Sequence, residues 1–155
     1  MRVWRLCKHR YEDTAFEGVG AKRAGGRWNS KGVPMVYTSA NLSLAALELL
    51  VHLNVEEEPP ELIAIWAEVP DKLLTRSYDV EDMPEGWERV TGHHTLVKWG
   101  DDWLRSRESV ALIVPSVVIA EEHNVLLNSE HPDFSSSIQI GTARSFSFDE
   151  RLFAL

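Results

Sequence analysis

Short apolar runs separated by turn-forming residues dominate the chain. Segments such as "RVWRLC" and "LIAIWAEV" are rich in β-branched and aromatic residues and are bounded by charged residues, Pro, Gly or Asn, which is typical of β-strands. The pattern predicts strands at Arg2–Cys7, Met35–Thr38, Leu62–Val69, Val110–Val114, Asn124–Leu127 and Ser145–Phe148.

Helical spacing occurs in two places. In "SANLSLAALELLVHL" the apolar positions recur at intervals of three and four and include Leu44, Leu47, Leu50 and Val51. This spacing predicts an amphipathic helix whose start Ser39, Asn41 or Ser43 can cap, and whose inward face Leu44, Leu47 and Val51 border. A second helix is expected over Trp99–Arg105. The connections "NVEEEPPEL" and "SYDVEDMPEGWERV" are expected to be an acidic loop and a turn-rich link.

Strands outnumber helices and the two do not alternate regularly. That order favours an α+β fold over a doubly wound parallel sheet. A chain of 155 residues has the size of one domain and buries about two-thirds of the surface that its unfolded form exposes. No linker divides it, so residues 1–155 are expected to form a single domain.

The composition of the chain indicates which classes of molecule it is suited to bind. The net charge is −8, which argues against direct binding of nucleic acid, because that affinity depends on Lys and Arg neutralising phosphates. A basic protein partner suits this charge better. No segment approaches the roughly 18 consecutive apolar residues of a membrane span. The opening "MRVWRLCKHR" lacks the apolar run of a secretory signal, so we expect a cytoplasmic protein without a membrane association.

Cysteine and histidine give no support to a metal site. The single cysteine, Cys7, cannot form an internal disulfide, and its strand-like context predicts a buried, inert thiol. His93 and His94 are adjacent, so their side chains diverge, and the other histidines form no i,i+4 pair. We therefore expect no metal.

The stretch "GGRWNSKGVPMVYTS" contains more chemistry than a turn requires. Gly, Asn and Pro suffice to lead a chain into a strand, which leaves Arg27, Trp28, Lys31 and Tyr37 to be explained. Cations beside aromatic rings suit an anionic ligand that carries a ring. The alternative is structural, with the guanidinium of Arg27 stacked on the indole of Trp28.

Familiar nucleotide and hydrolase motifs do not fit. A Walker A loop needs Lys followed by Ser or Thr after its last Gly, whereas Lys31 precedes Gly32. The G-x-G-x-x-G fingerprint and the G-x-S-x-G nucleophile elbow are absent from the sequence. A nucleotide bound here is not held in the Rossmann manner.

Two further polar residues lie beside predicted apolar elements. Glu48 stands one turn from Leu44 at the edge of the first helix's apolar face, where a carboxylate needs a partner or a function. A surface pair between Glu48 and His52 is the alternative. Ser116 follows Pro115 at the end of a strand, where it can contact a ligand or serve as an ordinary turn residue.

Together these segments resemble a known family. "GRWNSKGVPMVYTS", "LAALELLVH", "LIVPS" and "HNVLLNSEHPDF" are similar in order and spacing to the RES domain, and the resemblance covers essentially the whole chain. It implies a split β-sandwich with flanking helices, like that of ADP-ribosyltransferases. It also implies a toxin of a bacterial toxin–antitoxin pair that consumes NAD as a substrate, with no separate cofactor.

The resemblance also carries site residues. It implies catalytic roles for Arg27, Tyr37, Glu48 and Ser116, and substrate-binding roles for Arg27, Trp28, Lys31, Tyr37 and Asn128. Arg27 and Lys31 would hold the pyrophosphate, and the nicotinamide would stack on Tyr37 or Trp28.

Glu48 would stabilise the oxocarbenium-like ribose, and Ser116 would position the ribose or the carboxamide. Ser129 replaces a proline that is usual after Asn128, which puts the placement of Asn128 in question.

The implied partner is an antitoxin with a helix-turn-helix DNA-binding part and a segment that plugs the NAD cleft. The acceptor of the ADP-ribosyl group stays open among water, phosphate and a protein side chain, and so does homo-oligomerisation. The alternative function is a non-catalytic nucleotide-binding or interaction module with the same fold.

Overall fold

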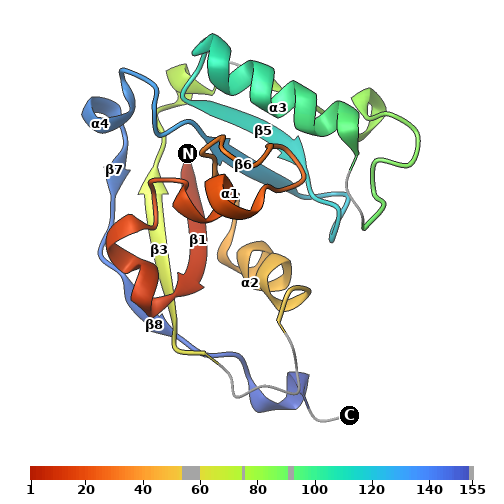
Figure 1. The fold of residues 1–155 in the computed structure, drawn as a ribbon. Coiled ribbons are helices and arrows are strands. Elements are labelled where there is room, and N and C mark those ends of the chain that lie inside the picture. Colours follow the sequence, from red (N-terminus) through yellow and green to blue (C-terminus); the bar gives the residue numbers. More distant parts are fainter. Residues whose placement is uncertain (54–59, 75, 91–92, 154–155) are drawn as a thin grey trace.

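A strongly bent β-sheet forms the framework of the protein (Figure 1). The computed structural model describes residues 1–53, 60–74, 76–90 and 93–153. Eight strands follow the order β4-β5-β6-β2-β1-β3-β7, and β8 pairs with β3 beside this path. Their bounds are β1 Arg2–Lys8, β2 Val36–Ser39, β3 Leu62–Glu68, β4 Arg76–Ser77, β5 Ala111–Pro115, β6 His123–Leu127, β7 Gln139–Ile140 and β8 Arg144–Phe146.

Helices flank this sheet. The α-helices are α1 Val19–Ala24, α2 Leu42–Leu50, α3 His94–Ser106 and α4 Phe134–Ser137. Short 3₁₀ helices are η1 His9–Thr14, η2 Asp71–Leu73, η3 Val80–Asp82 and η4 Glu150–Leu152. Figure 1 shows α3 lying along β5, and α2 beside β1 where the two parts of the sheet meet. The α+β prediction is confirmed.

The sheet opens between β1 and β2. These two strands share a single residue pair, Trp4 with Ser39, whereas β1 pairs with β3 along the whole length from Arg2 to Lys8. One part of the sheet therefore contains β2, β4, β5 and β6, and the other contains β1, β3, β7 and β8. The strands of the two parts run in different directions in Figure 1, which agrees with a split sandwich.

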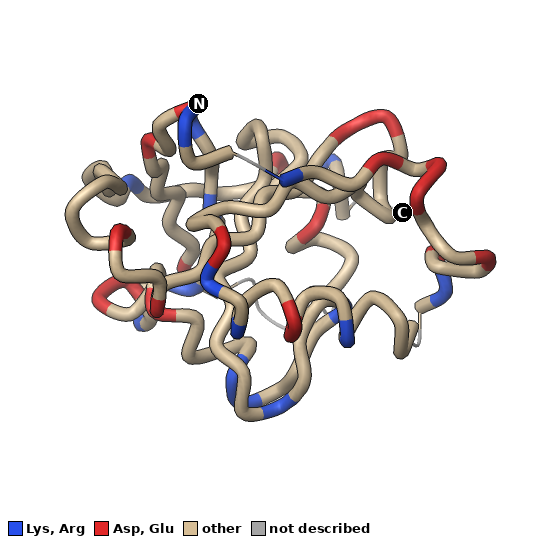
Figure 2. The backbone as a smooth tube through the Cα atoms, turned by 90° about the horizontal axis from the view of Figure 1, so that it is seen from above, with Lys and Arg blue, Asp and Glu red and all other residues tan. Residues whose placement is uncertain are grey.

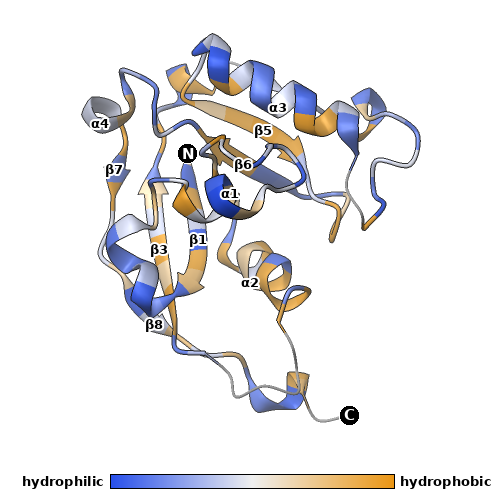
Figure 3. Cartoon of the chain, viewed as in Figure 1, coloured by the Kyte–Doolittle hydropathy of each residue, from blue (hydrophilic) through white to orange (hydrophobic). Residues whose placement is uncertain are grey.

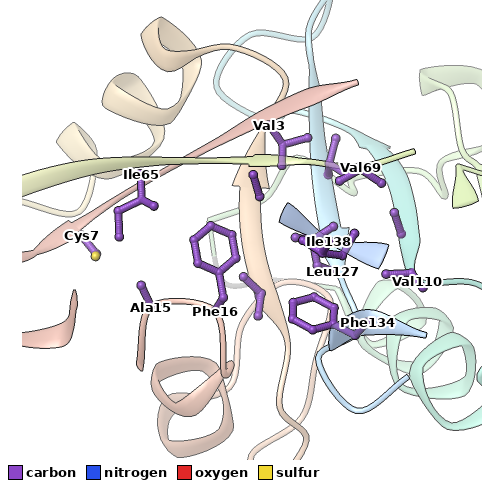
Figure 4. Close-up of a cluster of buried hydrophobic side chains, with 14 of the residues drawn as sticks. Val3, Cys7, Ala15, Phe16, Ile65, Val69, Val110, Leu127, Phe134 and Ile138 are labelled. Atoms are coloured by element: carbon purple, nitrogen blue, oxygen red, sulfur yellow. The ribbon is translucent and has the colours of Figure 1, made fainter. Parts of the chain in front are cut away.

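Three apolar clusters stabilise this arrangement. The largest fills the space between the two parts of the sheet (Figure 4) and includes Val3, Phe16, Ile65, Leu127 and Phe134. A second lies under α3, and a third joins α2 to β1 and β3. Figure 3 shows the matching pattern, with apolar residues along β3 and β5 and alternating colours on α3. Burial of these faces is the main favourable term in folding.

All six predicted strands are present, with boundaries that differ by two residues at most. The first helix begins after Asn41, whose side chain accepts a hydrogen bond from the backbone N–H of Leu44 at 2.8 Å. The second helix begins five residues earlier than expected, at His94. The shorter elements α1, β4 and β7 were not predicted, because two to six residues are too few to show a period.

The inward face of α2 was predicted wrongly. Leu44 is buried, but Leu47 is 37% exposed and Val51 is 60% exposed. Ala45 packs against the sheet in their place, because this side of α2 contacts β1 and β3. The side of α2 that carries Leu44 and Glu48 faces the other part of the sheet. Cys7 is buried as expected, and burial raises the pKa of its thiol. Residues 54–59 of the predicted acidic loop lie outside the described residues.

Candidate active site

The loop that carries Arg27 is held rigidly between α1 and α3. Asn29 is buried, and its amide donates hydrogen bonds to the backbone carbonyls of Ala21, Ser30 and Val33 at 2.9–3.0 Å. From the other side, the carboxylate of Asp101 on α3 accepts a hydrogen bond from the N–H of Ser30 at 2.9 Å. These contacts fix the backbone on both sides of Arg27.

Arg27 lies half-buried at the edge of this loop. Its Nη1 donates to the carbonyl oxygens of Trp87 at 2.6 Å and Arg89 at 3.1 Å. Burial lowers the pKa of Arg27, while the negative charge of Glu48 acts in the opposite direction. Arginine nevertheless stays cationic in proteins. The structure thus brings a fixed cation within electrostatic reach of the Glu48 carboxylate.

Tyr37 supports the same loop from β2. Its hydroxyl donates to Asn29 Oδ1 at 2.7 Å and accepts from the N–H of Trp28 at 3.0 Å. A Cβ added at Gly26 would lie 2.5 Å from this hydroxyl, so the loop backbone rests directly on it. Burial raises the pKa of Tyr37, which keeps the phenol protonated. The hydroxyl holds the loop, and only the half-buried ring remains for contact with a ligand.

Glu48 is held by two donors on a single oxygen. Ser116 Oγ donates to Glu48 Oε1 at 2.8 Å, and Asn124 Nδ2 donates to the same oxygen through a short hydrogen bond. Within the described part of the chain, no ion pair joins Glu48 to His52, so the surface-pair alternative is not observed. Helix α2 carries this carboxylate, and Ser116 after β5 and Asn124 on β6 position it.

The structure places Ser116 behind Glu48 and not in an open cleft. Its side chain is 0% exposed, and its Oγ accepts hydrogen bonds from the N–H groups of Val118 and Ile119, both at 3.0 Å. Because those donors occupy the lone pairs, its own proton must point to Glu48. The structure therefore places the hydroxyl of Ser116 on Glu48, and the expected contact of Ser116 with ribose or carboxamide stays a prediction.

Trp28 and Asn128 also lie away from any open surface. Trp28 is 2% exposed and stacks on Tyr78 with ring centroids 6.0 Å apart, and no cation–π contact joins it to Arg27 in the described residues. Asn128 is 0% exposed; its amide donates to Leu104 O at 3.0 Å and its Oδ1 accepts from the N–H of Glu130. Both residues support α3 instead of lining a site.

Lys31, in contrast, is exposed at the end of the Arg27 loop. It follows the two basic residues Lys22 and Arg23 in the last turn of α1. Figure 2 shows Lys and Arg stretches grouped along the lower edge of that view, whereas Asp and Glu stretches lie mainly elsewhere. Four cations, Lys22, Arg23, Arg27 and Lys31, thus lie in the segment 22–31 of a chain of net charge −8.

Sequence reasoning missed Asn124. This residue lies on β6 and pairs with Ser39 of β2, whose Oγ donates to Asn124 Oδ1 at 2.7 Å. Asparagine is depleted in strands, so its position in the apolar run "HNVLL" was an available signal. A second missed contact joins Asn41 Nδ2 to Glu122 Oε2 at 2.7 Å and ties the start of α2 to the β5–β6 turn.

The other features of the described residues lie apart from Arg27 and Glu48 or are absent. A hollow of about 680 Å³ lies between β3, β8 and the chain near Phe153, and Arg27 and Glu48 do not line it. In the described residues, no group of three His, Cys, Asp or Glu side chains is arranged to hold a metal ion. No helix among them is long and apolar enough to cross a membrane. Arg27 and Glu48, whose charges influence each other, are therefore the residues on which the candidate site is built.

The fold has a solved counterpart. This bent sheet with flanking helices is similar to a chain in the crystal structure of the Mycobacterium tuberculosis MbcT–MbcA toxin–antitoxin complex, with a TM-score of 0.61 and 17% identity over 99% of this chain and 86% of that chain. At that identity the likeness establishes the fold. A model of the RES domain matches residues 2–149, and the protein belongs to the RES domain family.

Relatives with closer sequences match along nearly their full length. The chain is 35% identical to the "Prs ADP-ribosylating toxin" of Sphingobium sp. strain YBL2, covering 96% of this chain and 94% of that protein. It is 34% identical to "Toxin Res" of Yersinia enterocolitica, covering 98% and 99%, and 32% identical to "Toxin Res" of Photorhabdus laumondii, covering 98% and 97%. The family resemblance seen in the sequence is confirmed.

Proposed function

We propose that this protein is the toxin of a toxin–antitoxin pair and that it cleaves the nicotinamide–ribose bond of NAD. The observation that carries the proposal is the Glu48 carboxylate, held by Ser116 and Asn124 on one oxygen and lying within electrostatic reach of Arg27. Its relatives named as toxins, one of them ADP-ribosylating, support the same reaction class.

Arg27 supplies recognition of the substrate. NAD carries a pyrophosphate, and a guanidinium binds phosphate oxygens through parallel N–H donors. In the described residues, the hydrogen bonds of Arg27 all leave from Nη1, so Nε and Nη2 are available to donate to phosphate oxygens. Lys22, Arg23 and Lys31 lie in the same segment and add positive charge that attracts the doubly negative pyrophosphate.

Glu48 supplies the chemistry. When the C–N bond between ribose and nicotinamide breaks, its electron pair moves to the pyridinium nitrogen, so nicotinamide leaves neutral and needs no general acid. Positive charge develops on the ribose, and a fixed carboxylate stabilises it. An acceptor O–H then forms the new C–O bond and releases its proton.

The acceptor decides the name of the reaction. Water gives ADP-ribose, inorganic phosphate gives ADP-ribose-1″-phosphate, and a protein side chain gives a covalent mass increment on that protein. The name of the Sphingobium relative supports a protein acceptor. Mass analysis of the products formed from NAD, with and without phosphate or lysate, distinguishes the three.

The decisive experiment compares Glu48→Gln with the unchanged protein and with Glu17→Gln, which alters an exposed carboxylate away from the cluster. The amide at position 48 keeps an Oε1 acceptor for Ser116 and Asn124, so the variant should fold. Because it lacks the negative charge, nicotinamide release should fall by about 10²-fold or more. Release by Glu17→Gln should be unchanged.

Two outcomes would reject parts of this proposal. Near-normal release by a folded Glu48→Gln would remove Glu48 from the chemistry. No release by the unchanged protein, with water, phosphate or lysate present, would indicate the alternative, a non-catalytic nucleotide-binding or interaction module.

An antitoxin partner completes the proposal. The structural neighbour comes from a toxin–antitoxin complex, and a cation at a ligand site offers a contact for a carboxylate of an inhibitory segment. Cellular NAD should fall when the protein is produced alone in bacteria and stay level when it is produced with the product of the adjacent reading frame. A level NAD pool in the first case would contradict toxicity through NAD loss.

A further inference from the structure

Within the described residues, a series of side-chain hydrogen bonds through Asn124 connects Ser39 of β2 to Glu48. Ser39 Oγ donates to Asn124 Oδ1 at 2.7 Å, and Asn124 Nδ2 donates to Glu48 Oε1. Since the carboxylate of Glu48 can only accept, the amide nitrogen of Asn124 must face it, which leaves the amide oxygen to accept from the hydroxyl of Ser39. The amide of Asn124 is thus held from both sides, by Ser39 of β2 and by Glu48 of α2.

These hydrogen bonds determine which carboxylate oxygen of Glu48 is available to a ligand. Ser116 and Asn124 both donate to Oε1, and no hydrogen bond from the described residues reaches Oε2. Two donors that converge on one oxygen fix the rotation of the carboxylate as well as its position. A single donor would leave the group free to turn about its last bond.

We propose that Asn124 is a positioning residue for the reaction, whose amide holds Oε1 of Glu48 so that Oε2 is presented to the ribose of bound NAD. The proposal rests on the proposed function for its reaction. Its structural part, that Asn124 orients Glu48, stands on the hydrogen bonds alone.

Kinetics give the first test. In Asn124→Ala, kcat for nicotinamide release should fall roughly 10- to 100-fold, as is usual when a group that orients a reacting residue is removed, while KM for NAD changes less than about twofold. In a Glu48→Ala background, adding Asn124→Ala should produce no further loss, because the residue it positions is gone. Ser39→Ala should lower kcat in the same direction and by less.

A thermal-unfolding cycle gives a second test that needs no activity. The melting temperatures of Glu48→Ala, Asn124→Ala and the double variant should be non-additive by about 2 °C or more, because the two side chains share one hydrogen bond. Asn128→Ala is the matched control: this buried asparagine bonds Leu104 and Glu130, so its effect should add to that of Glu48→Ala.

The outcomes separate the two claims. If the unchanged protein releases no nicotinamide, the proposed function fails, and the unfolding cycle alone decides whether Asn124 orients Glu48. Additive melting temperatures for the Glu48 and Asn124 pair would overturn the inference. So would unchanged kcat in an active Asn124→Ala, or a loss that appears entirely in KM.

Discussion

Replacing Gly100 by alanine should destabilise the protein, although the same change usually stabilises a helix. Gly100 lies inside α3, where alanine is favoured over glycine by about 1 kcal/mol. Here, however, a Cβ would lie 1.8 Å from the carbonyl oxygen of Trp28 and 2.8 Å from its carbonyl carbon. These are backbone atoms, so no change of side-chain rotamer relieves the overlap, and either α3 or the Arg27 loop must move.

The expected loss of stability is the difference between the cost of overpacking and the gain in helix propensity. Overpacking of a filled interior costs typically about 1–3 kcal/mol, and this contact lies far inside any tolerated distance, so we take the upper end. After the helix gain of about 1 kcal/mol is subtracted, a net loss of about 2 kcal/mol remains. For a chain of this size that corresponds to a fall in melting temperature of about 4–8 °C.

The assay is thermal unfolding followed by circular dichroism, with Gly20→Ala as the control. Gly20 also lies in a helix, and nothing is within 4 Å of a Cβ built there. Its melting temperature should stay equal to that of the unchanged protein or rise. Because Trp28 adjoins Arg27, folded Gly100→Ala should also show a raised KM for NAD. A Gly100→Ala variant that melts at or above the unchanged protein would refute the argued contact between α3 and the loop.

Two further predictions concern the loop itself. Arg27→Lys keeps the charge but loses the planar fork, so KM for NAD should rise about tenfold or more with a smaller change in kcat; an unchanged affinity would return Arg27 to a structural role. Tyr37→Phe leaves Trp28 N–H without its acceptor and Asn29 Oδ1 without its donor, which should cost about 1–3 kcal/mol of unfolding free energy. Because burial raises the pKa of Tyr37, its contribution to the free energy of unfolding should be complete below the unfolded-state pKa of about 10 and decline as the pH rises above that value. An equally steep loss of stability at alkaline pH in Tyr37→Phe would contradict this assignment.

The parts of the fold that the sequence could predict are those with a strong local period. The apolar runs around Val3, Ile65 and Leu112 are strands because β-branched and large apolar residues pack well on a pleated surface. The inward face of α2 could not be predicted in the same way. Spacing identifies an apolar face, but the exposure of Leu47 and Val51 depends on which part of the split sheet the helix covers.

Only part of the candidate site, too, could be predicted from the sequence. Arg27, Tyr37 and Glu48 are recognisable because their residue types are unusual beside a turn and an apolar helix, and the structure brings their charges and dipoles together. The role of Ser116 was not predictable, because the spacing of a strand end does not reveal where a hydroxyl points. Its direction depends on Val118 and Ile119, whose N–H groups occupy the lone pairs of its oxygen.

Glu48 depends on both parts of the split sheet. The helix that carries it packs through Ala45 against Leu6 and Ala64 of β1 and β3, whereas its carboxylate is held by residues of the β5–β6 part.

One more side chain spans the opening, since Arg5 on β1 donates from Nη1 to the carbonyl oxygen of Tyr37 on β2 at 2.8 Å. Burial lowers the pKa of Arg5, so its charge is kept at a cost in desolvation that the carbonyl contact offsets in part. A shift of one part of the sheet against the other would displace both the Arg5 contact and the Glu48 carboxylate, so the relative position of the two parts and the geometry of the carboxylate are coupled.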